Sequence, residues 1–233
     1  MAALKTIGLV GGMSWESSAH YYRIINETVK NKLGGLHSAQ CILSSLDFHP
    51  LEEAQAQGDW ETVAEILATA ALGLEQAGAD FVLLCSNTAH KVAALVEKRI
   101  TIPLLHIADV TAKEVSRNSI AKVGLLGTRF TLDENFYTDR LKQYGLEPLL
   151  PPAKERAQID HIIFAELCRG IIKAESKQLC LAIMARLADR GAQGIILGCT
   201  EIGLIVGQED TATPLFDTSA IHARAAAELA LQP

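Results

Sequence analysis

Short runs of apolar residues alternate along this chain with longer stretches in which apolar residues recur every three or four positions. The short runs predict buried β-strands, and the longer stretches predict amphipathic helices that pack against them. Strands and helices that alternate in this way are typical of parallel sheets flanked by helices. The pattern therefore predicts an α/β fold.

The same pattern gives approximate bounds for each element. We expect strands at residues 6–10, 39–44, 81–85, 104–107, 122–126, 146–149, 194–198 and 215–217. We expect helices at residues 16–33, 60–77, 88–98, 108–117, 132–144, 155–169, 175–190 and 218–231. Asp59 is a suitable N-cap for the second of these helices, and Gly78 is a suitable stop after it.

Three pairs of segments repeat in the same order along the chain. The pairs are residues 7–12 (IGLVGG) and 123–128 (VGLLGT), residues 78–88 (GADFVLLCSNT) and 191–200 (GAQGIILGCT), and residues 102–106 (IPLLH) and 213–217 (TPLFD). We infer two similar parallel-sheet domains related by a pseudo-twofold axis. Ligands of such sheets bind at the carboxyl ends of the strands, so we expect the active site in a cleft between the domains.

The repeat also suggests where the domains divide. We expect an N-terminal α/β domain at residues 1–100, completed by residues 212–233, and a C-terminal α/β domain at residues 101–211.

Each half carries a small nucleophilic side chain where its repeated strand ends. When the two Gly-Ala pairs are aligned, Ser86 falls on Cys199 and Asn87 falls on Thr200. Adjacent side chains of a strand point to opposite faces, so Cys85 and Ser86 do not both face the site. The repeat favours Ser86, and Cys85 takes its place if the loop register differs.

The residues around Cys199 suggest a reactive thiol. A buried strand precedes it, and we expect a turn or helix to begin just after it. A thiol at a helix N-terminus has a lowered pKa, which favours the thiolate. A buried structural cysteine is the alternative interpretation.

Composition narrows the classes of function. The chain has 233 residues, 49% of them hydrophobic, and a net charge of -6 without a basic cluster, which argues against nucleic acid as a partner. We find no apolar stretch of membrane-spanning length and no secretory signal, and we expect a cytoplasmic protein. The five scattered cysteines contain no CxxC pair and are interpreted as free thiols, with no metal site.

Three motifs resemble those of the aspartate/glutamate racemase family. Residues 84–90 (LCSNTAH) and 198–201 (GCTE) are similar to its two signatures, and residues 11–17 (GGMSWES) are similar to its opening loop. The resemblance implies racemisation without a cofactor by two groups on opposite faces of the α-carbon, an amino acid dicarboxylate as substrate, and a homodimer. Glu201 stands where glutamate racemases usually carry His, so the aspartate branch is the closer match.

One departure from the family pattern affects the mechanism. The family usually has Cys directly before the Asn-Thr pair, where this chain has Ser86. A hydroxyl without an adjacent base accepts a proton far less readily than a thiolate does. We therefore expect Cys199 to be the main base and Ser86 to be its partner acid.

Other residues are candidates for substrate binding. The side chains of Asn87, Thr88 and Thr200 are donors for the α-carboxylate, and Gly12, Met13 and Thr128 bring backbone close to the ligand. The alternative explanation for Gly12 is that an ordinary turn requires a glycine there. Arg169 is a bidentate partner for the distal carboxylate, or equally a solvated charge at a helix end.

Three further side chains are assigned by position. Asp47 is a candidate partner for the substrate ammonium group, and His49 is a candidate lining residue. Glu201 either orients Thr200 or contacts the ammonium group. His90 lies about one helical turn beyond Ser86, but no Asp or Asn is available to orient it, so we expect a structural role.

Two other functions remain open at this level. The first is a related enzyme, such as a decarboxylase that uses a single cysteine, or another racemase or isomerase. The second is a small-ligand binding protein without catalytic activity, since two α/β lobes around a cleft also describe such proteins.

Overall fold

Two parallel β-sheets form the framework of the computed structural model, which describes residues 4–232. Each sheet belongs to its own unit. The first unit contains the described residues up to Ile107 together with those from His222 onward, and the second unit is Ala108–Ile221. The two units are described separately below.

The first unit contains the strands β1 (Ile7–Gly11), β2 (Cys41–Ser45) and β3 (Phe81–Leu84). They are parallel and have the order β2-β1-β3, and a single parallel bridge from Val82 to Leu104 extends the sheet beyond β3. The helical elements are α1 (Trp15–Leu33), α2 (Phe48–Gln57), α3 (Trp60–Gln76), the 3₁₀ turn η1 (Thr88–Val92), α4 (Ala93–Glu97) and most of α10 (Thr218–Ala230).

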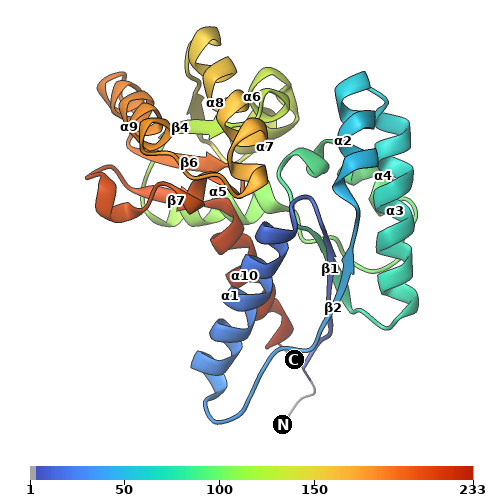
Figure 1. The fold of residues 1–233 in the computed structure, drawn as a ribbon. Coiled ribbons are helices and arrows are strands. Elements are labelled where there is room, and N and C mark those ends of the chain that lie inside the picture. Colours follow the sequence, from blue (N-terminus) through green and yellow to red (C-terminus); the bar gives the residue numbers. More distant parts are fainter. Residues whose placement is uncertain (1–3, 233) are drawn as a thin grey trace. The chain divides into compact units, whose positions relative to one another are not determined.

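Two apolar cores cover the two faces of this sheet. One core joins Val10 and Leu84 to the buried face of α3, where apolar residues recur at three- and four-residue spacing. The other joins Leu9 and Leu83 to four alanines of α10, namely Ala223, Ala226, Ala227 and Ala230. Figure 1 shows α2, α3 and α4 on one side of the sheet and α1 and α10 on the other. Successive strand residues thus enter different cores, as the alternation of side chains along a strand requires.

The second unit contains the strands β4 (Lys122–Gly127), β5 (Glu147–Leu149), β6 (Gly194–Gly198) and β7 (Leu215–Asp217). They are parallel and have the order β5-β4-β6-β7. The helical elements are α5 (Ile107–Arg117), α6 (Arg129–Asp133), α7 (Asn135–Gln143), α8 (Ala153–Ala165), η2 (Leu167–Arg169), α9 (Ala174–Asp189), η3 (Ile202–Leu204) and η4 (Gln208–Asp210). Apolar residues of α8 and α9 form a core with Leu126, Ile195 and Leu197.

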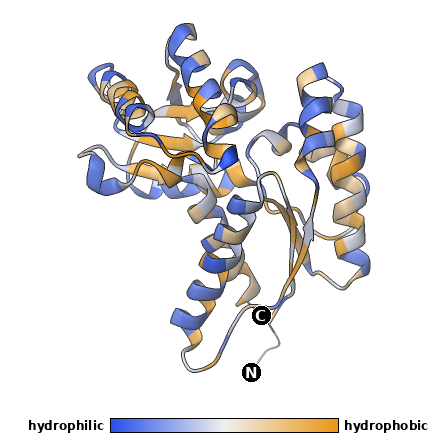
Figure 2. Cartoon of the chain, viewed as in Figure 1, coloured by the Kyte–Doolittle hydropathy of each residue, from blue (hydrophilic) through white to orange (hydrophobic). Residues whose placement is uncertain are grey.

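The two sheets share one topology, which confirms the α/β fold and the internal repeat. In both sheets the first strand in sequence lies between the second and the third. The Val82–Leu104 bridge in the first unit has the same place as β7 in the second. Figure 2 shows hydrophobic colour along the strands and hydrophilic colour along many helix surfaces, as expected for buried parallel sheets.

Several details differ from the sequence prediction. The helix expected at 155–169 is divided into α8 and η2, and α6, before the helix expected at 132–144, was not predicted. The segment expected as a strand at 104–107 forms only the bridge at Leu104, and α5 begins at Ile107. Helix α2 was not predicted, although Asp47 caps its start and Gly58, in a left-handed conformation, ends it. The helix expected at 88–98 consists of the 3₁₀ turn η1 followed by the short α4.

The division between the units also differs from the predicted one. We expected residues 212–233 to complete the first domain, but β7 pairs with β6 and belongs to the second sheet. The chain joins the first unit only from His222, within α10. Among the described residues, no helix is both long enough and apolar enough to span a bilayer.

Candidate functional site

The end of β3 separates Cys85 from Ser86. The Cys85 N–H donates to the Val10 carbonyl at 2.9 Å, and its side chain is fully buried in the core that contains Leu83. Burial, together with the nearby Cys41 thiol, raises the pKa of Cys85 well above its usual range. Ser86 is only half-buried. Cys85 is therefore a packed thiol, and Ser86 is the more accessible of the two.

The loop after Ser86 leads directly into η1. Asn87 and Thr88 are both buried, and Asn87 has a helical backbone conformation. His90 is buried as well, and its ring lies against this loop, because Nδ1 is 2.8 Å from the Ser86 carbonyl oxygen.

The packing of the loop after β1 accounts for Gly12 without reference to a ligand. Gly12 has a φ of 91°, and a Cβ at this position would collide with the backbone of Leu46. Its N–H donates to the Ser18 hydroxyl at 2.8 Å. The Met13 side chain is buried in the apolar core of α3. Close packing against the segment after β2 is therefore the physical reason for Gly12.

Asp47 and His49 begin a helix in this structure. The Asp47 side chain caps α2 by accepting the His49 N–H at 3.2 Å. The His49 ring is 75% exposed and lies 3.6 Å from the Glu53 carboxylate. The prediction that these two residues bind the substrate thus acquires a competing structural explanation, namely the start of α2.

In the second unit, Thr128 and Cys199 follow adjacent strands. Gly127 of β4 pairs with Gly198 of β6, so the two residues that come next leave the sheet side by side. A Cβ on Gly198 would lie 2.7 Å from the Leu126 carbonyl oxygen, which explains the glycine before the cysteine. Thr128 is buried and caps α6 by accepting the Thr131 N–H at 3.4 Å.

The environment of Cys199 overturns the prediction of a lowered pKa. Only the three-residue turn η3 follows, so no α-helix N-terminus stabilises a thiolate here. The Cys199 Sγ–H donates to Glu201 Oε2 at 2.9 Å, and both residues are buried. Burial first, and the negative charge of Glu201 second, raise the pKa of Cys199 well above its usual range. The raised pKa keeps the proton on the Cys199 sulfur.

Thr200 shares the same carboxylate. Its hydroxyl donates to Glu201 Oε2 at 2.7 Å. A hydroxyl has a single proton, so this bond removes the donor that we expected Thr200 to offer to the α-carboxylate. Of the two roles expected for Glu201, the structure supports the one in which it orients Thr200.

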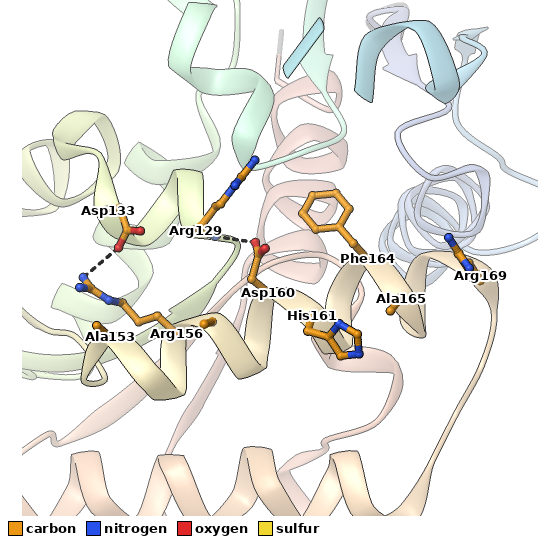
Figure 3. Close-up of a pocket in the computed structure, with 10 residues that line it drawn as sticks. Arg129, Asp133, Ala153, Arg156, Asp160, His161, Phe164, Ala165 and Arg169 are labelled. Carbon is orange, nitrogen blue, oxygen red and sulfur yellow. Dashed lines mark hydrogen bonds and ion pairs between the residues drawn. The ribbon is translucent and has the colours of Figure 1, made fainter. Parts of the chain in front are cut away.

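Arg169 lines a pocket that lies wholly within the second unit. The pocket has a volume of about 490 Å³ and runs along α8 towards η2 (Figure 3). Arg156 is paired with Asp133 at 3.0 Å, and Asp160 accepts the backbone N–H of Arg129 at 2.8 Å. Arg129 and Arg169 themselves have no carboxylate within ion-pair distance among residues 4–232.

Sequence analysis did not identify Arg129. Arg129 directly follows Thr128, which the internal repeat had selected as a candidate. This position is the one signal in the sequence that could have identified Arg129. No helix pattern predicts that α6 and η2 present Arg129 and Arg169 to one pocket. Within the part of the chain that the structure describes, no three His, Cys, Asp or Glu side chains are grouped as metal ligands.

Comparison with protein families gives one match that covers most of the chain. A family model described as Asp/Glu/hydantoin racemase matches residues 10–226. Among curated proteins, the broad specificity amino-acid racemase RacX of Bacillus subtilis (strain 168) is 27% identical over 169 residues, which are 71% of this chain and 71% of that protein.

Solved structures extend this similarity to the whole fold. A candidate Asp/Glu racemase from Yersinia pestis is 50% identical, with a TM-score of 0.91 over 98% of this chain and 100% of that one. An aspartate racemase homologue from Pyrococcus horikoshii OT3 is 34% identical, with a TM-score of 0.85 over 98% of this chain and 100% of that one.

Proposed function

Because this chain belongs to the Asp/Glu/hydantoin racemase family, we propose that it racemises aspartate or glutamate without a cofactor. Cys199 and Ser86 act on opposite faces of the same α-carbon. Two groups are needed because removal of the α-proton leaves a carbanion, and inversion requires that the new proton reach the other face. A single base tends to return the proton to the side from which it came.

The register of the two sheets is the observation that carries this proposal. Val10 pairs with Leu84 in the first sheet, and Leu126 pairs with Leu197 in the second. Val10 and Leu126 are equivalent in the sequence repeat. The residue two positions beyond Leu84 is Ser86, and the residue two positions beyond Leu197 is Cys199. Backbone pairing, independent of side-chain chemistry, thus supports the equivalence of Ser86 and Cys199.

The Cys199–Glu201 pair supplies the stronger base. In the resting state the thiol donates to the carboxylate. When the proton moves from Sγ to Oε2, the products are a thiolate and a neutral carboxylic acid, and no buried negative charge is added. That balance matters because a buried site penalises each additional charge. Ser86, directly or through a bound water, delivers a proton to the opposite face and regains one from solvent. Glu201 releases its proton to solvent, so that Cys199 ends as the thiol and Glu201 as the carboxylate.

The pocket lined by Arg129 and Arg169 supports a dicarboxylate substrate. Arg129 and Arg169 line it together, and neither is neutralised by a carboxylate among the described residues. A guanidinium binds a carboxylate through two parallel hydrogen bonds, which fixes both position and orientation. We assign the distal carboxylate of the substrate to this pocket and its α-carboxylate to Asn87 and Thr88.

Proton NMR in D₂O tests the reaction class and the substrate together. Separate samples of L- and D-aspartate and of L- and D-glutamate should lose the α-proton signal without an added cofactor. Cys199→Ala should abolish the loss, whereas Cys180→Ala, which removes another buried thiol of the same core, should retain it. Ser86→Cys should accelerate exchange, because a thiol exchanges protons more readily than a hydroxyl.

Other outcomes identify the alternatives. Release of carbon dioxide from a malonate-type acid, without exchange at either amino acid, indicates a decarboxylase. Tight binding without turnover, unaffected by Cys199→Ala, indicates a binding protein. The proposal includes a homodimer, and sedimentation equilibrium that gives the monomer mass contradicts that part.

A further inference from the structure

His90 has both ring nitrogens engaged by backbone groups of the first unit. It lies in η1 and is 3% exposed. Nδ1 is 2.8 Å from the carbonyl oxygen of Ser86, and Nε2 is 3.2 Å from the backbone nitrogen of Ile107. The ring therefore connects the loop that carries Ser86 to the first residue of α5.

These two contacts fix the position of the proton on the ring. A carbonyl oxygen only accepts, so Nδ1 must carry the hydrogen and donate it to Ser86. A backbone N–H only donates, so Nε2 must present its lone pair to Ile107. A charged ring would direct an Nε2–H at the Ile107 N–H, two donors facing each other. The geometry thus selects the neutral ring with its proton on Nδ1.

The bond to Ser86 also orients the next peptide group. The Ser86–Asn87 peptide is trans, since the one cis bond among the described residues joins Met13 and Ser14. In a trans peptide the C=O and N–H vectors point in opposite directions. With the Ser86 carbonyl held on His90, the Asn87 N–H points away from the ring. Hydrogen bonding at the carbonyl also polarises the peptide and strengthens that N–H as a donor.

Neighbouring histidines restrict the ring further. The His106 ring centroid lies 4.5 Å from that of His90, and the His222 ring centroid lies 5.8 Å away. His222 donates from Nε2 to the carbonyl of Leu105 at 2.8 Å. The segment that contains Leu105 and Ile107 is thus bound by two different imidazoles, and it holds the far side of His90 in place.

We propose that His90 is a positioning residue that aims the Asn87 N–H at the negative charge that develops on the substrate during proton removal. This inference rests on the proposed role of the Ser86 loop in catalysis. His90 touches no substrate in this account. It acts through the Ser86 carbonyl, and its contribution is made in the transition state, when the charge on the substrate is greatest.

Two substitutions separate the two contacts of the ring. The amide nitrogen of His90→Asn can take the place of Nδ1 and donate to Ser86, whereas His90→Gln reaches Ile107 and leaves the Ser86 carbonyl without its donor. We expect His90→Asn to keep kcat within about threefold and His90→Gln to lower kcat about 100-fold with little change in KM. His37→Gln is the control, because it alters an exposed histidine of the same unit. It should keep kcat.

The assay is α-proton exchange measured on folded protein, with histidine-selective ¹⁵N NMR of the same samples. The NMR signals should show Nδ1 protonated and Nε2 unprotonated in the wild-type protein at neutral pH. A ring with its proton on Nε2, or His90→Gln with the kcat of the wild type, overturns the positioning role. If the expected tautomer is present but the wild type exchanges no α-proton, the proposed function fails while the His90 geometry stands.

Discussion

His222 should make the first unit of this protein sensitive to mild acid. Its ring is fully buried. Nε2 donates to the Leu105 carbonyl, and Nδ1, 2.9 Å from the Tyr21 hydroxyl, accepts from it. The other group that faces the ring is His90, from η1. No carboxylate is within ion-pair distance of His222 among the described residues, so a positive charge on this ring has no compensating partner.

The size of the effect follows from the titration of the ring. Burial first, and the neighbouring His90 second, lower the pKa of His222 from 6.5 to about 3. Between these two values the unfolded chain binds more protons than the folded protein does, so the free energy of unfolding falls as the pH falls. The stability is fully present above pH 6.5. From pH 7.5 to pH 5.5 the loss is about 1.4 kcal/mol, or tenfold in the unfolding equilibrium constant.

Urea titrations at these two pH values measure the loss directly. Both tryptophans of the chain, Trp15 and Trp60, lie in the first unit, so intrinsic fluorescence reports on the unit that contains His222. In His222→Gln the amide still donates to Leu105, but the group that titrates is gone. The variant should lose about 1.4 kcal/mol less than the wild type between the two pH values.

The comparison isolates His222 from the other histidines. His90 and His106 remain in both proteins, so subtracting the two losses removes their contribution except for the part that depends on the contact between His90 and His222. His37→Gln, at an exposed position of the same unit, should show the wild-type pH dependence. If His222→Gln loses as much stability as the wild type over the same range, the ring is not held neutral by burial and the reasoning is refuted.

Three further predictions concern the site. Glu201→Gln removes the negative charge that, after burial, raises the pKa of Cys199, so alkylation of Cys199 should begin at lower pH. Cys41, whose pKa burial raises to about 11, serves as the internal reference in peptide mapping. Cys85→Ala should cost about 1–2 kcal/mol in urea titrations because it leaves a gap in a filled core, yet keep the α-proton exchange rate per folded molecule; an inactive, folded variant would transfer the catalytic role from Ser86 to Cys85. Gly12→Ala should lower the melting temperature by at least about 4 °C, because φ is positive and a Cβ meets the Leu46 backbone, whereas Gly73→Ala, in open space on α3, should not lower it.

The sequence was sufficient to predict strands and helix ends that depend on residues close together in the chain. The apolar runs predicted all the named strands, and Asp59 caps α3 as expected by accepting the Thr62 N–H at 3.0 Å. Helix α2 had similar signals in Asp47 and Gly58, but Asp47 was interpreted as a ligand for the substrate. A polar residue at the end of a strand has the same appearance in both roles, because capping and ligand binding use the same acceptor atoms.

Contacts between distant residues account for what the sequence missed. The segment at 104–107 looked like a strand, but the Leu105 carbonyl and the Ile107 N–H bind imidazoles that come from elsewhere in the chain. The pKa of Cys199 was predicted in the wrong direction chiefly because tertiary packing buries the thiol, and the charge of Glu201 adds to the effect. Glu201 is a close neighbour in sequence, yet nothing in the pattern indicates that its carboxylate turns back to accept the thiol proton.

The internal repeat itself argues that the two proposed catalytic groups, Ser86 and Cys199, are not equivalent. The alignment that pairs Ser86 with Cys199 also pairs Thr88 with Glu201, so only Cys199 has an ionisable partner two residues away. The two enantiomers have equal free energy in an achiral solvent, and this asymmetry therefore cannot shift the racemisation equilibrium.

The asymmetry between Ser86 and Cys199 should instead affect how often an abstracted proton returns to the same face. In the proposed mechanism Glu201 first releases to solvent the proton that it took from Cys199. Its carboxylate can then accept the abstracted proton and exchange it for deuterium before the proton is returned, whereas the repeat gives Ser86 no such acceptor. One enantiomer recovered from D₂O before inversion should therefore carry more deuterium than the other, and Glu201→Gln should reduce the difference. Equal deuterium in both recovered enantiomers would show that the carboxylate takes no part in proton transfer.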